Sequence, residues 1–94
     1  MNKSKLEDEV FYGGHAETLA SNPAYQAAIT RIRARLFDSF GSTGFFQRRK
    51  RDEIWRMKRV IDDFEQELEI MIRDGKLAQQ DLNDENLIQS DKIK

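Results

Sequence analysis

Cysteine is absent from this chain of 94 residues, and proline, histidine and tryptophan occur once each. Without cysteine there can be no disulfide bond and no thiolate metal site. With His15 as the lone histidine, the sequence also lacks the usual ligands of a zinc site. No apolar run approaches the roughly 20 residues that a membrane-spanning helix needs, and residues 1–10 are too polar for a signal peptide. We therefore expect an intracellular protein with no metal, no cofactor and no membrane contact.

Groups for catalysis are also missing. Ser39, Ser42 and Thr43 have no base close by in the sequence that could activate a hydroxyl nucleophile. Carboxylates recur at helical spacing after residue 60, but no Glu-x-x-His element accompanies them, as a di-metal site in a helix bundle would require. The sequence predicts that the chain is not an enzyme.

Charge is abundant but unevenly placed. Charged residues make up 35 % of the chain, and the net charge is only −1. Residues 31–59 carry ten Lys and Arg against three Asp and Glu, whereas residues 60–74 carry six acids against one Arg. A helix with a basic start and an acidic end opposes its own macrodipole, which favours the reverse order. The distribution suggests a partner that compensates it, either phosphate or the acidic half of another copy of the chain. The acidic residues that offer such a matching surface are Asp62, Asp63, Glu65, Glu67 and Glu69.

The stretch 47–74 predicts one long helix. Its apolar residues recur at alternating steps of three and four, which is a heptad pattern on one side of a helix, and Gly75 is placed to end it. The seam consists of Ile54, Met57, Ile61, Phe64, Leu68 and Met71. Because so long a seam must be buried, we expect self-association, with Phe64, Leu68 and Met71 as the contact residues.

A shorter helix should precede it. Asn22 is a good N-cap and Pro23 suits the first helical position, and the helix should run to about Phe40, with Gly41 as its stop. Ser42 or Thr43 could cap the long helix, and the short connection of residues 41–46 favours an antiparallel neighbour. The predicted fold is therefore all-α, an antiparallel helical hairpin with a long second helix and flexible termini.

The ends of the chain read as polar extensions. Gly13-Gly14 should break any helix at that point, so residues 1–14 form an arm. Residues 15–78 form the helical hairpin domain, and residues 79–94 form a polar C-terminal tail.

Two groups of residues are candidates for binding. Aromatic side chains in and after the predicted loop could anchor a protein partner, although Phe45 and Phe46 could instead close the end of the hairpin, and Trp55 could belong to a second core stripe. Basic residues beside them could bind phosphate groups of nucleic acid, and the alternative is a solvated face. The possible phosphate-binding residues are Arg48, Arg49, Lys50, Arg51, Arg56 and Arg59.

Part of the sequence resembles a family of short helical proteins of tailed bacteriophages and prophages. The resemblance lies in Asn22-Pro23 with Tyr25, Ala28 and Leu36, in the pair Ile54-Trp55, and in the ending Asp74-Gly75-Lys76-Leu77-Ala78. Phe37 and Phe40 stand where the family pattern has a tryptophan, and Ser42-Thr43-Gly44-Phe45-Phe46 replaces a Thr-Pro start of the second helix. Such proteins tend to be encoded among head, portal and packaging genes, so the resemblance implies a structural or assembly role.

These observations together predict a non-enzymatic phage protein that binds itself and another phage or host protein. It would be a virion, head-assembly or packaging component, found in the host cytoplasm or the virion. The first alternative is a nucleic-acid-binding protein, such as a small terminase-like DNA recogniser or a transcription regulator. Against it, the sequence shows no pair of short helices typical of a helix-turn-helix, and the net charge is not basic. The second alternative is a phage inhibitor of a host protein.

Overall fold

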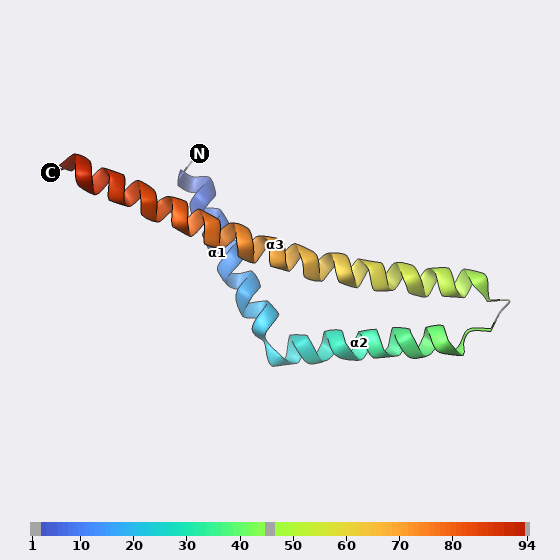
Figure 1. Ribbon diagram of the computed structural model, residues 1–94. Helices are drawn as coiled ribbons and strands as arrows, with labels where there is room; N and C mark the ends of the chain where they lie inside the picture. Colours follow the sequence, from blue (N-terminus) through green and yellow to red (C-terminus); the bar gives the residue numbers. More distant parts are fainter. Residues whose placement is uncertain (1–2, 45–46, 94) are drawn as a thin grey trace. The chain divides into compact units, whose positions relative to one another are not determined.

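The chain is helical over nearly all the residues described by the computed structural model, which are 3–44 and 47–93, with side chains up to residue 86. Three helices follow one another along it: α1 (Lys3–Ser21), α2 (Pro23–Ser42) and α3 (Arg48–Ile93) (Figure 1). No strand occurs in these residues. The predicted all-α class and the long final helix are confirmed.

The start of α2 follows the sequence prediction closely. The side-chain oxygen Oδ1 of Asn22 accepts hydrogen bonds from the backbone amides of Ala24 (2.8 Å) and Tyr25 (3.0 Å). Pro23 occupies the first helical position, where no hydrogen-bond donor is needed. The N-cap is therefore a local feature that the residues themselves determine.

The end of α2 differs from the prediction. Gly41 lies inside the helix, and no described glycine has a positive φ. The helix ends when the amide and the hydroxyl of Thr43 both donate to the carbonyl oxygen of Phe40, at 3.2 and 2.6 Å, while the hydroxyl of Ser42 donates to Ser39 O at 3.0 Å. Ser42 and Thr43 thus close α2 and do not cap α3.

Three other glycines were expected to interrupt helices, and that expectation is wrong. α1 continues through Gly13 and Gly14, and α3 continues through Gly75. A Cβ atom at Gly13 would lie 2.8 Å from Gly75 Cα and 2.8 Å from Met71 O, so the two backbones nearly touch there. Glycine is needed at this crossing because it has no side chain, and the helical contact offsets its poor helix propensity.

The chain forms two compact units, each with its own interior. Unit 1 comprises Met1–Leu19 with Glu67–Lys94, and unit 2 comprises Ala20–Gln66. Unit 1 buries a set of small and aliphatic residues, namely Leu6, Gly13, Ala16, Leu68, Gly75 and Ala78. The division into arm, domain and tail that the sequence suggested stays a prediction.

Unit 2 has a far smaller interior. Ile54, with 8 % of its surface exposed, is its one buried residue among those described. α2 and the first part of α3 meet through Tyr25 with Phe64, whose ring centroids are 6.3 Å apart, and through Arg33 with Asp62. Most of the apolar side chains of this unit are therefore left facing solvent.

Candidate protein-binding surface

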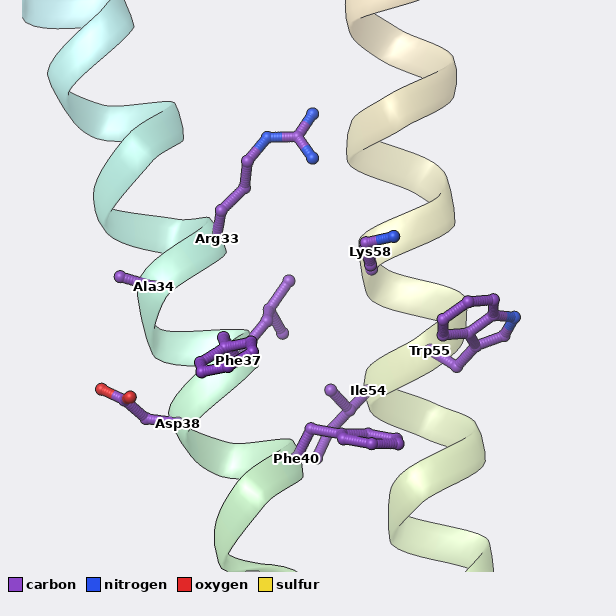
Figure 2. Close-up of a pocket in the computed structure, with 9 residues that line it drawn as sticks. Arg33, Ala34, Phe37, Asp38, Phe40, Ile54, Trp55 and Lys58 are labelled. Carbon is purple, nitrogen blue, oxygen red and sulfur yellow. The ribbon is translucent and has the colours of Figure 1, made fainter.

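A groove lies between α2 and the first turns of α3 in unit 2, with a volume of about 570 Å³. Its apolar walls come from Phe37 and Phe40 on α2 and from Ile54 and Trp55 on α3. Figure 2 shows Phe40 and Ile54 in the space between the two helices, and Trp55 on α3 with its ring pointing away from α2 in this view. We call this feature the Phe37–Trp55 groove.

The aromatic side chains of the groove are unusually open to solvent. Phe37 is 78 % exposed and Trp55 is 58 % exposed. A large side chain gains roughly 1.5–3 kcal/mol when it is fully buried, so both residues would gain from contact with another apolar surface. Exposed aromatic residues that gather at one place are typical of interface anchors.

Cations support two of these rings. The ammonium nitrogen of Lys58 lies 4.9 Å from the centre of a Trp55 ring, and the guanidinium carbon of Arg51 lies 4.5 Å from the centre of the Phe40 ring. Such contacts stabilise an exposed pair by about 0.5–1 kcal/mol. They restrict the positions of the two rings, which would lower the entropic cost of binding at this surface.

An ion-pair cluster lies at the side of the groove nearer the middle of α3. The guanidinium of Arg33 donates to Asp62 (2.5 Å) and to Glu65 (2.8 Å), and Lys58 lies 3.8 Å from Asp62. The hydrogen bond to Asp62 is the main reason why the pKa of Arg33 is raised above its usual value. Because the guanidinium is held by two carboxylates, this part of the groove has fixed charges.

Tyr25 carries a polar group that the helix pair leaves unsatisfied. Its hydroxyl oxygen is buried and makes no hydrogen bond among the described residues. Burial, and then the nearby charge of Glu65, raise the pKa of Tyr25. The phenol therefore stays neutral, and its contribution is the ring contact with Phe64.

A second apolar surface lies on α3 away from the groove. Met57, Val60 and Phe64 are 57 %, 66 % and 48 % exposed, and their spacing of three and four residues places them in one line along the helix. Trp55 and Met57 are two residues apart, which is about 200° around a helix of 3.6 residues per turn. This Val60 stripe, made of Met57, Val60 and Phe64, is thus separate from the groove.

The residues expected to mediate self-association are divided by the structure. Phe64 is exposed on the Val60 stripe in unit 2. Leu68, 8 % exposed, is buried in unit 1, and Met71 is half-buried there with its carbonyl oxygen near Gly13. Of the three, Phe64 is the residue that presents a large apolar surface to a partner.

The basic residues of early α3 form a mixed set. Arg48, Arg49 and Lys50 are exposed, as are Arg56 and Arg59, whereas Arg51 is half-buried against Phe40. The first turn of α3 contains no acidic residue, so the positive charge lies where the helix macrodipole disfavours it. Phe45 and Phe46, the two predicted loop anchors, lie outside the described residues.

The sequence prediction missed the contribution of α2 to this surface. Trp55 was singled out because it lies off the heptad seam, but on α2 Phe37 was read only as a departure from a family pattern and Phe40 was also read as part of the apolar face of its own helix. Phe37 directly follows Leu36, which belongs to the regularly spaced apolar face of this helix (Tyr25, Ile29, Ile32, Leu36 and Phe40), so Phe37 lies about 100° around the helix from Leu36. This position of a large aromatic residue off the apolar face was the sequence feature that could have indicated a binding surface on α2.

Neither a metal site nor a membrane span can be assigned to the described residues. No three His, Asp or Glu side chains there lie close enough to hold a metal ion, and no helix in that part of the chain is long and apolar enough to cross a membrane. Comparisons with protein-family models, with curated proteins and with solved structures found no match to this chain.

Proposed function

We propose that this protein acts by binding other proteins, without catalysis, through the antiparallel hairpin of unit 2. The observation that carries the proposal is the exposure of Phe37, Trp55 and Val60 around a unit whose described residues bury Ile54 alone. Small helical domains with so little buried surface are marginally stable by themselves. A partner that covers these side chains would stabilise the unit and account for their presence.

Two partners belong to this proposal, since the unit has two apolar surfaces. Self-association would cover one surface, and another phage or host protein would cover the other. The Phe37–Trp55 groove suits a side chain or helix of the second partner, because it is an apolar hollow beside the fixed charges of Arg33 and Lys58. Apolar centres with charged rims are typical of specific protein interfaces.

The biological setting in the proposal comes from the resemblance to small helical phage proteins. On that basis the chain is a virion, head-assembly or packaging component that works in the host cytoplasm or in the virion. Assembly proteins need binding surfaces and no catalytic groups, which agrees with a surface that offers aromatic anchors and ion pairs.

The test of the groove is co-purification with the products of the genes that flank its own. We expect one of these products to bind the wild-type chain and to be lost with the double change Phe37→Ser and Trp55→Ser. The control is Arg49→Gln, an exposed change outside the groove. Equal binding by all three proteins, or binding to none of them, would contradict the assignment of the groove.

Nucleic acid is the second candidate, supported by the exposed Arg48, Arg49 and Lys50. If DNA were the ligand, its affinity would fall steeply with salt because each neutralised phosphate releases counterions. We expect only weak binding at low salt, lost near physiological salt. Sub-micromolar, sequence-selective DNA binding at physiological salt, abolished when residues 48–51 are changed to glutamine, would replace protein binding as the function.

A further inference from the structure

The middle of α3 has a self-complementary order of charges. Residues 56–60 read Arg-Met-Lys-Arg-Val and residues 61–65 read Ile-Asp-Asp-Phe-Glu. If a second copy of this helix is laid antiparallel with a two-fold axis between positions 60 and 61, every basic residue comes level with an acidic one and every apolar residue with an apolar one. The level pairs are Arg56 with Glu65, Met57 with Phe64, Lys58 with Asp63, Arg59 with Asp62, and Val60 with Ile61.

The apolar members of this order are available for such a contact. Met57, Val60 and Phe64 form the exposed Val60 stripe. α2 packs mainly against another side of the same helix, where Arg33 holds Asp62 and Glu65, and it meets the end of the stripe where the Tyr25 ring lies 6.3 Å from the Phe64 ring. The stripe therefore keeps about half or more of its surface exposed, and in an antiparallel copy Met57 comes level with Phe64 and Val60 with Ile61.

Two charges at the outer edge of the stripe lack a partner. Arg56 and Asp63 are seven residues apart, which places them on the same side of the helix two turns from each other. Both are exposed, and neither forms an ion pair with another described residue. In an antiparallel pair this edge of one copy faces the same edge of the other, so the Arg56 of each copy lies near the Asp63 of the other, whereas a parallel pair sets this edge against the opposite edge of the partner.

We infer that the Val60 stripe is the contact of a symmetric dimer, in which a second copy of the chain packs antiparallel around a two-fold axis between Val60 and Ile61. The inference rests on the proposed function, because it names the partner of one of the two surfaces. A two-fold contact uses the same surface twice, so it leaves both Phe37–Trp55 grooves of the dimer free for another protein.

Cysteine cross-linking tests the position of the axis, since the natural chain contains no cysteine. In a Val60→Cys chain the two sulfurs face each other close to the axis, within the short reach of a disulfide. We expect mild oxidation to convert most of this variant to a covalent dimer. The control is Gln66→Cys, an exposed neutral position that is six residues farther along and faces away from the stripe; it should stay monomeric on a reducing-agent-free gel.

Mixed cross-linking tests the direction of the helices. An antiparallel pair brings residue 57 of one copy to residue 64 of the other, so Met57→Cys and Phe64→Cys chains should cross-link far better when mixed than when oxidised separately. In a parallel pair each variant would cross-link with itself. Circular dichroism before oxidation shows that each variant keeps its helices.

Charge reversal gives an independent readout in solution. Arg56→Glu alone and Asp63→Arg alone should each weaken self-association roughly tenfold, because two like-charge contacts replace two ion pairs. A mixture of the two variants should associate about as well as the wild-type chain, because both contacts become attractive again. Sedimentation equilibrium measures all three samples.

The outcomes separate this inference from the proposed function. If the wild-type chain dimerises but Val60→Cys cross-links no better than Gln66→Cys, or if Met57→Cys cross-links with itself, the assigned contact is wrong and self-association stands. If the wild-type chain is a monomer of native stability at micromolar concentration, both the contact and the self-association are wrong. In that case the groove still has its own test in co-purification.

Discussion

The crossing of α1 and α3 in unit 1 yields the sharpest prediction, because alanine should stabilise one of two adjacent glycine positions and be neutral or destabilising at the other. A Cβ added at Gly13 would lie 2.8 Å from the backbone of Gly75 and 2.8 Å from the carbonyl oxygen of Met71. A Cβ added at Gly14 would meet no atom within 4 Å. Both residues lie inside α1, so their backbone conformations are alike.

The change in stability expected for each alanine variant follows from two opposing effects, helix propensity and overpacking. In the interior of an exposed helix, alanine in place of glycine stabilises by about 1 kcal/mol. At Gly13 the new methyl group is about 0.6 Å inside the 3.4 Å limit of ordinary contacts, so the helices must separate or strain. Overpacking of this kind costs roughly 1–3 kcal/mol. The separation also weakens the neighbouring contacts of the buried Leu6 and Ala16.

The assay is urea or thermal unfolding followed by circular dichroism at one fixed protein concentration, because self-association shifts apparent stability. We expect Gly14→Ala to raise the free energy of unfolding by up to about 1 kcal/mol. The free energy of unfolding of Gly13→Ala should be about 1–3 kcal/mol lower than that of Gly14→Ala. For a domain of this size, 1 kcal/mol corresponds to roughly 4–8 °C in Tm. If Gly13→Ala and Gly14→Ala stabilise equally, the close crossing does not exist in solution.

Three further predictions concern unit 2. Asn22→Ala removes the oxygen that accepts two backbone hydrogen bonds and should lower the free energy of unfolding by about 1 kcal/mol. Asn22→Ser should keep most of the wild-type stability, because serine is also a good N-cap. An unchanged Tm for the alanine variant would contradict the role of Asn22 as the cap. Tyr25→Phe removes a buried hydroxyl without a hydrogen bond and should be neutral or stabilising by up to about 1 kcal/mol. Because burial and then Glu65 raise the pKa of Tyr25, the phenol of the unfolded chain ionises first as the pH rises, and stability that is present below pH 10 is lost above it. Unfolding measured as a function of pH should therefore show a smaller alkaline loss of stability for Tyr25→Phe than for the wild-type chain. If Tyr25→Phe behaves like the exposed control Tyr12→Phe, the reasoning is refuted. Arg33→Gln breaks two partly exposed ion pairs and should lower the free energy of unfolding by about 1 kcal/mol at low salt and by less at high salt. Denaturant unfolding curves at both salt concentrations measure this difference. A decrease in stability that is independent of salt would mean that charge is not the cause.

Local features of the chain could be predicted from the sequence because neighbouring residues alone determine them. Asn22 and Pro23 begin α2 since an N-cap oxygen and a fixed φ act within one turn. The heptad spacing likewise predicted that α3 would be helical across Ile54, Val60 and Phe64, since periodicity is a property of the sequence. The uneven charge is equally local, and its change from basic to acidic across positions 56–65 can be read directly from the sequence.

Only the tertiary structure decided what the glycines and the aromatic residues do. Taken alone, Gly13 and Gly75 indicate helix ends, because glycine is a poor helix former. Their role at a backbone crossing depends on two segments about 60 residues apart in the sequence, which come so close that an added Cβ would lie within 3 Å of the facing backbone. In the same way Phe37 and Trp55 become one groove only when α2 lies beside α3. The physical reason is that close approach and exposure depend on distant neighbours, which neither local propensity nor hydrophobic spacing encodes.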